Sequence, residues 1–123
     1  MFYEEEKELN AQFQKIKDNF FETLKEKMTF FHKGMWYLYV LKLEYDYVYV
    51  GITSNPRKRI RNHFFGNGAK ITQKFMPLEV IDIIECRPVR SEAEQIEDNV
   101  TENLFSTYGR DNVFGGKYCN TKN

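Results

Sequence analysis

The chain has 123 residues, 41% of them hydrophobic and 16% aromatic, which suffices for one modest core and argues against two globular domains. Its 18 basic and 18 acidic residues cancel, so the net charge favours no class of partner. The two cysteines, Cys86 and Cys119, are far apart and lack metal-ligand spacing, which indicates neither a disulfide framework nor a zinc site.

The acidic start of the sequence, residues 1–6, differs from the basic start of a signal peptide. No apolar run approaches the roughly 20 residues that a membrane-spanning helix needs. We therefore expect a soluble, intracellular protein with no membrane partner, in either the cytoplasm or the nucleus.

Apolar residues recur every three or four positions between Glu4 and Lys33, which predicts one long amphipathic helix that stops at Gly34. The stripe consists of Leu9, Phe13, Ile16, Phe20, Leu24, Met28 and Phe31. Such a stripe has to be buried, either on the rest of the chain or against a second copy or another protein. We accordingly predict an N-terminal helix at residues 1–34 and a separate domain at residues 35–123.

Two segments that follow, residues 36–43 and 47–53, are rich in aromatic and β-branched residues and predict an antiparallel hairpin. Tyr45 and Asp46 are expected to form its turn. Because side chains alternate between the faces of a strand, Tyr39 and Tyr49 should look into one space.

The rest of the chain predicts two more helices and one more strand. Asn55 and Pro56 are typical of a helix start, and that helix should run through Phe64 until the glycines at 66 and 68 break it. Residues 78–86 alternate as a third strand. Residues 91–94 have the pattern of a capping box for a helix ending near residue 108, and residues 110–123 are expected to be mostly loop.

These elements predict an α+β fold: a small three-stranded sheet, antiparallel or mixed, flanked by helices and preceded by the long N-terminal helix.

The basic segment of residues 51–74 carries six basic residues and no acidic one, whereas residues 79–102 carry eight acidic residues and two basic ones. Binding of an anion depends on the local potential within a Debye length of about 8–10 Å, not on the net charge. Within the basic segment, Arg59 and His63 are four residues apart on the predicted helix and can reach one phosphate group. A guanidinium suits a phosphate because its planar fork holds two oxygens and stays charged.

The order of these residues resembles the GIY-YIG endonuclease family over about residues 36–120. Tyr39 closes the first strand triplet of the family pattern, Tyr49 opens the second, and Gly51 ends it. Arg59 stands eight residues after Gly51, and His63 follows. On the last helix, residues 93–97 resemble the stretch that bears the metal-binding glutamate of the family, which here is Glu97.

The resemblance implies an endonuclease that hydrolyses a DNA phosphodiester bond with Mg²⁺ or Mn²⁺, and RNA stays open as a substrate. Tyr39 or Tyr49 is expected to act as general base, with His63 assisting. Arg59 is expected to stabilise charge on the phosphate, and Glu97 to hold the cation. Six further residues are expected to contact the substrate: Gly51, Arg57, Arg61, Lys70, Thr72 and Asn112.

Two departures from the family pattern keep alternatives open. Tyr37 replaces the first glycine of the name-giving triplet, and Phe114 stands where an arginine usually precedes the paired glycines 115 and 116. One alternative is a nucleic-acid-binding module of the same fold that no longer cuts. Another is a protein-interaction domain that uses the first helix, as a homodimer or with a partner protein.

Overall fold

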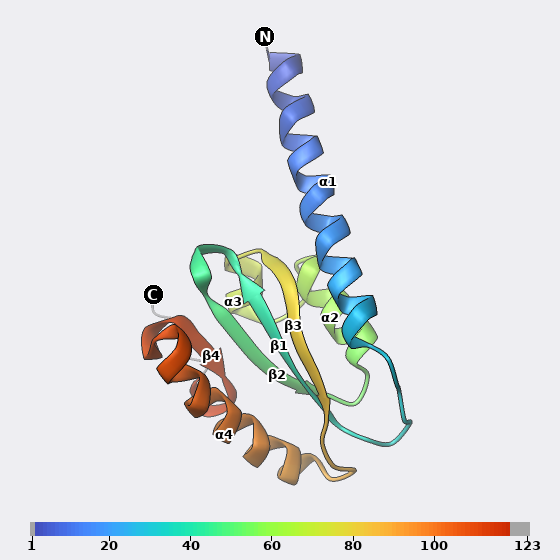
Figure 1. The fold of residues 1–123 in the computed structure, drawn as a ribbon, viewed down its shortest axis with the longest axis vertical. Coiled ribbons are helices and arrows are strands. Elements are labelled where there is room, and N and C mark those ends of the chain that lie inside the picture. The colour runs from blue at the N-terminus through green and yellow to red at the C-terminus, as the bar shows by residue number, and fades with distance from the viewer. Residues whose placement is uncertain (1, 119–123) are drawn as a thin grey trace.

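The computed structural model describes residues 2–118 of the chain as a mixed α+β fold with a long helix projecting from its body (Figure 1). The helices are α1 (Phe2–Lys27), α2 (Pro56–Phe64), α3 (Lys70–Lys74) and α4 (Arg90–Tyr108). The strands are β1 (Tyr37–Leu43), β2 (Val48–Thr53), β3 (Pro77–Glu85) and β4 (Val113–Gly115). No helix of the described part is both long enough and apolar enough to cross a bilayer.

The predicted hairpin is formed by β1 and β2, which pair antiparallel with Tyr39 opposite Gly51 and Leu41 opposite Tyr49. Tyr45 and Asp46 form the connection, and their φ angles of 61° and 62° give the left-handed backbone that a tight turn requires. Tyr39 and Tyr49 therefore share one face of the sheet, as the alternation predicts.

The sheet has four strands in the order β3-β1-β2-β4, one more than predicted. β3 pairs antiparallel with β1, and β4 pairs in parallel with residues 48–50 of β2. The prediction of a loop after residue 110 was wrong for residues 113–115. A strand of three residues that ends in glycine shows no measurable alternation, so its pairing is set by the tertiary structure.

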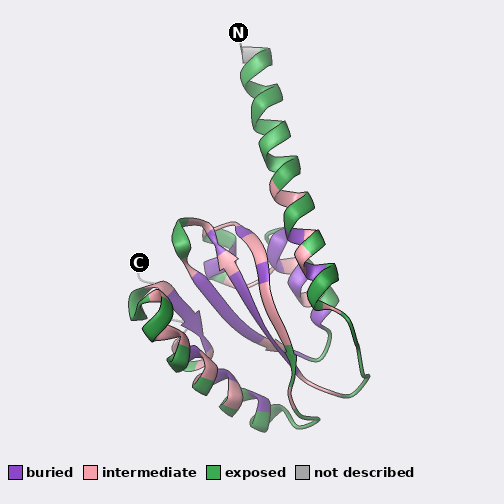
Figure 2. Cartoon of the chain, in the orientation of Figure 1, coloured by how far each residue is buried: buried purple, intermediate pink, exposed green. Residues whose placement is uncertain are grey.

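Most of β1, β2 and β4 is buried (Figure 2), and the two faces of the sheet carry different cores. On one face α1, α2 and α3 pack over a cluster that includes Phe20, Tyr39, Tyr49, Ile60 and Phe64. On the other face the aliphatic side chains of β1, β2 and β4 pack against α4. Helix α4 ends at Tyr108, and the next residue, Gly109, has a φ of 90° that suits a helix stop.

Helix α1 is shorter than predicted and only partly buried. It ends at Lys27, six residues before the expected end. Phe20 and Leu24 are buried against the sheet, but Leu9 and Phe13 are 63% and 43% exposed, on the half of the helix that projects away from the body (Figures 1 and 2). The expected burial of the whole stripe is therefore met within this chain only at Phe20 and Leu24, whereas Ile16 and Met28 are half-buried and Phe31 is exposed. The predicted boundary between an N-terminal helix at residues 1–34 and a domain at residues 35–123 stays a prediction.

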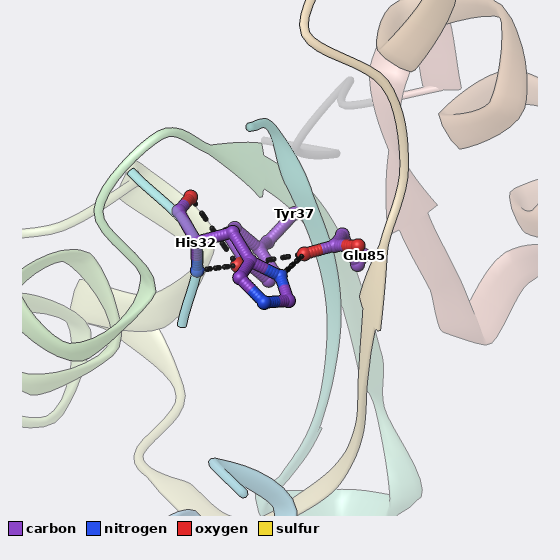
Figure 3. A network of polar contacts seen from close by, with 3 residues as sticks. All are labelled: His32, Tyr37 and Glu85. Atoms are coloured by element: carbon purple, nitrogen blue, oxygen red, sulfur yellow. Dashed lines mark hydrogen bonds and ion pairs between the residues drawn. The ribbon is translucent and has the colours of Figure 1, made fainter. Parts of the chain in front are cut away.

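Contacts between the segment after α1 and the sheet explain the early helix end (Figure 3). The His32 amide donates to Tyr37 Oη at 2.5 Å, and His32 Nδ1 lies 2.5 Å from Glu85 Oε1. Tyr37 Oη also donates to Glu85 at 3.1 Å, and Phe31 stacks on the Tyr37 ring at 5.8 Å. Tyr37, which replaces the family glycine, thus anchors the connection between α1 and β1.

The two later helices begin differently from each other. Asn55 caps α2 by accepting a hydrogen bond from the Lys58 amide at 3.3 Å, as predicted. The capping box predicted for α4 is absent: the helix begins at Arg90, its cap residue Val89 makes no side-chain bond, and Glu94 pairs with Arg90 at 3.1 Å. The i,i+4 ion pair occupies the glutamate that would have closed the box.

Candidate active site

A cavity of about 440 Å³ opens where β1, β2, α2, α4 and the segment after β4 meet. Its lining includes four of the five residues predicted for catalysis: Tyr39, Tyr49, Arg59 and Glu97. It also includes Ile52, Arg90, Glu94, Asp98, Gly116 and Lys117. The cavity therefore joins phenols and a guanidinium from one side with carboxylates from the other.

The short strand β4 makes this junction possible. β4 pairs only with residues 48–50 of β2, and no strand of the described chain continues that pairing along residues 51–53. At this open edge, groups from both faces of the sheet approach each other. Tyr49 and Arg59 come from the face of α2, whereas Glu97 comes from α4 on the opposite face.

Gly51 allows Tyr39 to reach the cavity. A Cβ atom at residue 51 would overlap Tyr39 Oη and lie 2.5 Å from Tyr39 Cζ. The Tyr39 ring therefore crosses directly over the backbone of the paired strand, a close approach that only glycine permits. The centroid of the Tyr49 ring lies 6.1 Å from that of Tyr39.

His63 does not line the cavity but is fully buried directly behind Tyr39. Its Nε2 lies 2.6 Å from Tyr39 Oη, and its Nδ1 lies 2.9 Å from Thr72 Oγ1. Burial lowers the pKa of the imidazole to about 3, and the Arg59 charge acts in the same direction. The ring is therefore neutral at physiological pH.

The hydrogen bonds around His63 assign its tautomer. The Ala69 amide donates to Nδ1 at 3.3 Å, and an amide nitrogen can only donate. Nδ1 is then an acceptor, and the single proton of the neutral ring is on Nε2, where it points at Tyr39 Oη. The Thr72 hydroxyl lies 2.8 Å from the Ala69 carbonyl and 2.9 Å from Nδ1, and in this tautomer its single proton turns to Nδ1. The imidazole thus donates to the phenol oxygen.

The environment of Tyr39 contains opposing influences on its ionisation. Burial raises the pKa of the phenol well above 10, and the neighbouring Tyr49 raises it further. The Arg59 guanidinium lowers that pKa, because a positive charge favours the phenolate. Tyr39 is therefore protonated in the free protein, although donors converge on its oxygen.

Glu97 is the buried carboxylate of the opposite wall, with 8% of its surface exposed. Burial raises the pKa of its carboxyl to about 7, and Asp98 and Glu94 raise it by like-charge repulsion. The Gly116 backbone amide and Arg90 lower it. A carboxylate that is desolvated among other acids gains stability when a cation binds it.

The paired glycines at the end of β4, Gly115 and Gly116, pack closely against this acidic wall. Gly115 packs so tightly that a Cβ atom would lie 2.6 Å from Thr101 Oγ1 and 2.8 Å from Val50 O. Gly116 has a φ of 49°, and a Cβ there would overlap Asp98 Oδ1. Asp98 also accepts from the Lys117 amide at 3.1 Å. The sequence signal for this arrangement was the glycine pair, but its partner on α4 was not identifiable from spacing.

The residues predicted to contact substrate are spread over several places. Gly51 lies beneath Tyr39, and buried Thr72 supports His63. Lys70 is exposed at the start of α3, a short helix that was not predicted. Asn112 lines another hollow beside Tyr108, to whose carbonyl it donates at 2.9 Å. Arg57 and Arg61 line a groove between α1 and α2. For all six residues, contact with substrate stays a prediction.

A divalent cation would have to bind with few protein ligands. The described residues contain no group of three or more histidine, cysteine, aspartate or glutamate side chains placed to hold a metal. Mg²⁺ commonly keeps several waters and is held by one or two carboxylates together with substrate phosphates. Glu97, with its raised pKa and its place on the cavity wall, fits that mode of binding.

Comparison with known proteins identifies the family. The model of the family described as GIY-YIG catalytic domain matches residues 35–108. A UPF0213 protein of Cupriavidus necator is 36% identical over 75 residues, which cover 61% of this chain and 79% of that protein. UPF0213 proteins of Cupriavidus pinatubonensis and Bacillus licheniformis are 39% and 38% identical and share 50% of this chain, with 68% and 62% of their own lengths covered. No solved structure is a significant match. The chain thus belongs to the GIY-YIG catalytic domain family, which has a nuclease-type fold.

Proposed function

We propose that this protein is an endonuclease that hydrolyses a DNA phosphodiester bond with the help of a divalent cation. One observation carries the proposal: two phenols, a guanidinium and a buried carboxylate, separated by up to 58 residues in sequence, line a single cavity. These are the groups that a phosphodiester hydrolysis requires, namely a base, a phosphate clamp and a cation ligand.

Arg59 binds the non-bridging oxygens of the reacting phosphate. It extends from α2 into the cavity, and no carboxylate within residues 2–118 forms an ion pair with it. Its guanidinium can therefore meet the negative charge that grows on the phosphate as water attacks. Removing one such preorganised donor typically lowers the rate about 10²–10³-fold.

Tyr39 and Tyr49 orient the attacking water, and Tyr39 is the phenol better placed to accept its proton. Nε2–H of His63 and the Arg59 charge both stabilise a phenolate at Tyr39 Oη. Burial opposes that ionisation, so we expect the rate to increase with pH above neutrality. His63 acts on Tyr39 and is a positioning residue in this mechanism.

Glu97 would hold the cation, and the neighbouring acids Glu94 and Asp98 would add to the negative potential around it. When bound, the cation supplies Lewis-acid stabilisation of the departing oxygen. Tyr37 and Phe114, the two departures from the family pattern, are absent from the cavity lining. Tyr37 anchors His32, and Phe114 packs edge-on against Tyr47 at 5.7 Å, so neither substitution removes a group from the proposed site.

The test is incubation of the purified protein with supercoiled plasmid, branched oligonucleotides, single-stranded DNA and RNA, each with Mg²⁺, Mn²⁺ or EDTA. We expect a metal-dependent cut in DNA that is lost in Glu97→Gln. Glu92→Gln is the matched control, because Glu92 is exposed on the same helix and lies outside the cavity. Absence of cleavage by folded protein would favour a module that binds without cutting. Full activity of Glu97→Gln would contradict the mechanism. Cleavage of RNA but not of DNA would mean that RNA is the substrate.

A further inference from the structure

A second hollow lies on the other side of α2, between that helix and α1. It has a volume of about 290 Å³ and is lined by Phe21, Leu24 and Lys25 of α1, by Met28 directly after α1, and by Arg57 and Arg61 of α2. We call it the α1–α2 groove. Its floor is apolar and its polar groups are three cations.

The cations of the α1–α2 groove lack carboxylate partners. No acidic residue lines the groove, and none of the three cations belongs to an ion pair within the described residues 2–118. Arg61 is instead held over the rings of Phe21 and Phe65, at 5.2 and 5.7 Å from their centroids. Like charges gathered without a counter-charge repel each other, and an anionic ligand relieves that repulsion.

The position of the groove relative to the cavity suggests which anion it takes. Arg57 and Arg61 are one helical turn apart and share a face of α2, whereas Arg59, two residues from each, points to the other side. Helix α2 is therefore a wall with cations on both sides, one side facing the cavity and the other facing the groove. A helix is about 10–12 Å wide, and a nucleic-acid strand carries a phosphate about every 3.4 Å along its axis. A strand that crosses α2 would place phosphates about three nucleotides apart on the two sides.

We infer that the α1–α2 groove binds the sugar-phosphate backbone of the same nucleic acid whose phosphodiester lies in the cavity, about three nucleotides from the reacting link. Lys25, Arg57 and Arg61 would contact the phosphates, and the apolar floor would contact the sugar. The inference rests on the proposed function for the identity of the ligand. It assigns a role to α1, which lies outside the family match at residues 35–108.

The first test is binding of a fluorescein-labelled duplex of about 30 base pairs in EDTA, measured by anisotropy over a range of salt concentrations. The variant Lys25→Glu/Arg57→Glu reverses two charges in the groove. The control Lys7→Glu/Lys15→Glu makes the same change in net charge at exposed positions of α1 that lie outside the groove. We expect roughly tenfold weaker binding by the groove variant alone and a salt slope smaller by about 1.8, as for two lost phosphate contacts.

The second test is a substrate scan with one neutral methylphosphonate at a time. A neutral link about three nucleotides from the cleaved bond should weaken binding by the native protein and leave binding by the groove variant unchanged. Equal loss of binding in the control variant, or a groove variant that binds and cuts as the native protein does, would overturn the inference. If the native protein binds through the groove and cuts nothing, the inference stands and the proposed catalysis fails.

Discussion

The two sides of α2 carry the same residue type in different surroundings. On one side Arg59 lies among two phenols and a wall of acids, in a cavity whose buried glutamate has a pKa of about 7 and behind which a histidine has a pKa of about 3. On the other side Arg57 and Arg61 lie over apolar and aromatic side chains beside another cation. The environment on the cavity side shifts the pKa values of neighbouring residues, whereas the groove only gathers positively charged side chains. The surroundings of the arginines, more than their charge, therefore distinguish the one proposed for catalysis from the two proposed for binding.

The sharpest test of this comparison removes one arginine from each side of α2 in turn. Arg59→Ala should lower single-turnover cleavage about 10²–10³-fold, because the group that meets the developing charge is lost. Arg57→Ala, two residues away, should weaken binding a few-fold and leave the rate at saturating DNA nearly unchanged. Quench-flow assays at several protein concentrations measure both quantities. Equal losses in the two variants would mean that α2 has no distinct sides.

A small change in side-chain shape should be harmful on the cavity side only. Gly51→Ala places a Cβ atom against the Tyr39 phenol and forces that ring to move. A misplacement of about 1 Å in a catalytic group can cost about 10²-fold in rate, so we expect a loss of that size. Met28→Leu, a volume-conserving change in the groove, should alter cleavage less than twofold. Circular dichroism checks that both variants fold, and near-native cleavage by Gly51→Ala would argue against Tyr39 as base.

Only the cavity side should make folding stability depend on pH near neutrality. The folded-state pKa of Glu97, about 7, lies above its unfolded value of 4.5, so the folded state binds more protons between these limits. Its burial penalty is therefore absent below about pH 4.5 and complete above pH 7. Glu97→Gln should add about 2–3 kcal/mol to the free energy of unfolding at pH 8 and almost nothing at pH 4.5.

Urea unfolding at both pH values measures this difference, and comparing variant with native protein at each pH cancels the titration of His63. That histidine has the opposite effect, because its pKa of about 3 lies below its unfolded value of 6.5 and stability is lost as pH falls through this range. Arg57→Gln is the groove control and should give a difference that does not vary with pH, since a guanidinium stays charged. A Glu97→Gln effect independent of pH would show that the carboxylate is ionised at a normal pKa.

The smallest effect separates charge from stacking in the groove. Arg61→Lys keeps the positive charge and loses the planar contact with Phe21 and Phe65. An exposed cation–π contact is worth about 0.5–1 kcal/mol, so DNA binding should weaken by about two- to fivefold. Arg59→Lys, the matched change in the cavity, should cost more, because the fork that binds two phosphate oxygens is lost. A larger effect at Arg61 would contradict the division of roles.

The sequence predicted the parts that depend on local chemistry. Alternation in residues 37–53 placed Tyr39 and Tyr49 on one face, and the Asn55–Pro56 start fixed the helix that carries Arg59. That these side chains meet Glu97 in one site was expected only from the resemblance to the family. Their catalytic roles stay predictions.

The parts that depend on tertiary contacts were not predictable. Helix α1 ends early because His32 binds Tyr37 and Glu85, a partner 53 residues away. Strand β4 is too short to show a pattern, and the overlap between Gly116 and Asp98 joins segments that no periodicity connects. The buried position of Thr72, whose hydroxyl lies 2.9 Å from His63 Nδ1, depends on α3, a five-residue helix that was not predicted.

The location of β4 also has a consequence for biosynthesis. Gly116 and Lys117, which complete the wall around Glu97 and Asp98, follow every other residue of the cavity in the chain. Translation proceeds from the N-terminus, so a nascent polypeptide that already contains the hairpin, α2 and α4 still lacks that wall. The cavity is therefore completed last, and a chain that stops before residue 113 contains Tyr39, Tyr49, Arg59 and Glu97 but lacks the segment that packs against Asp98.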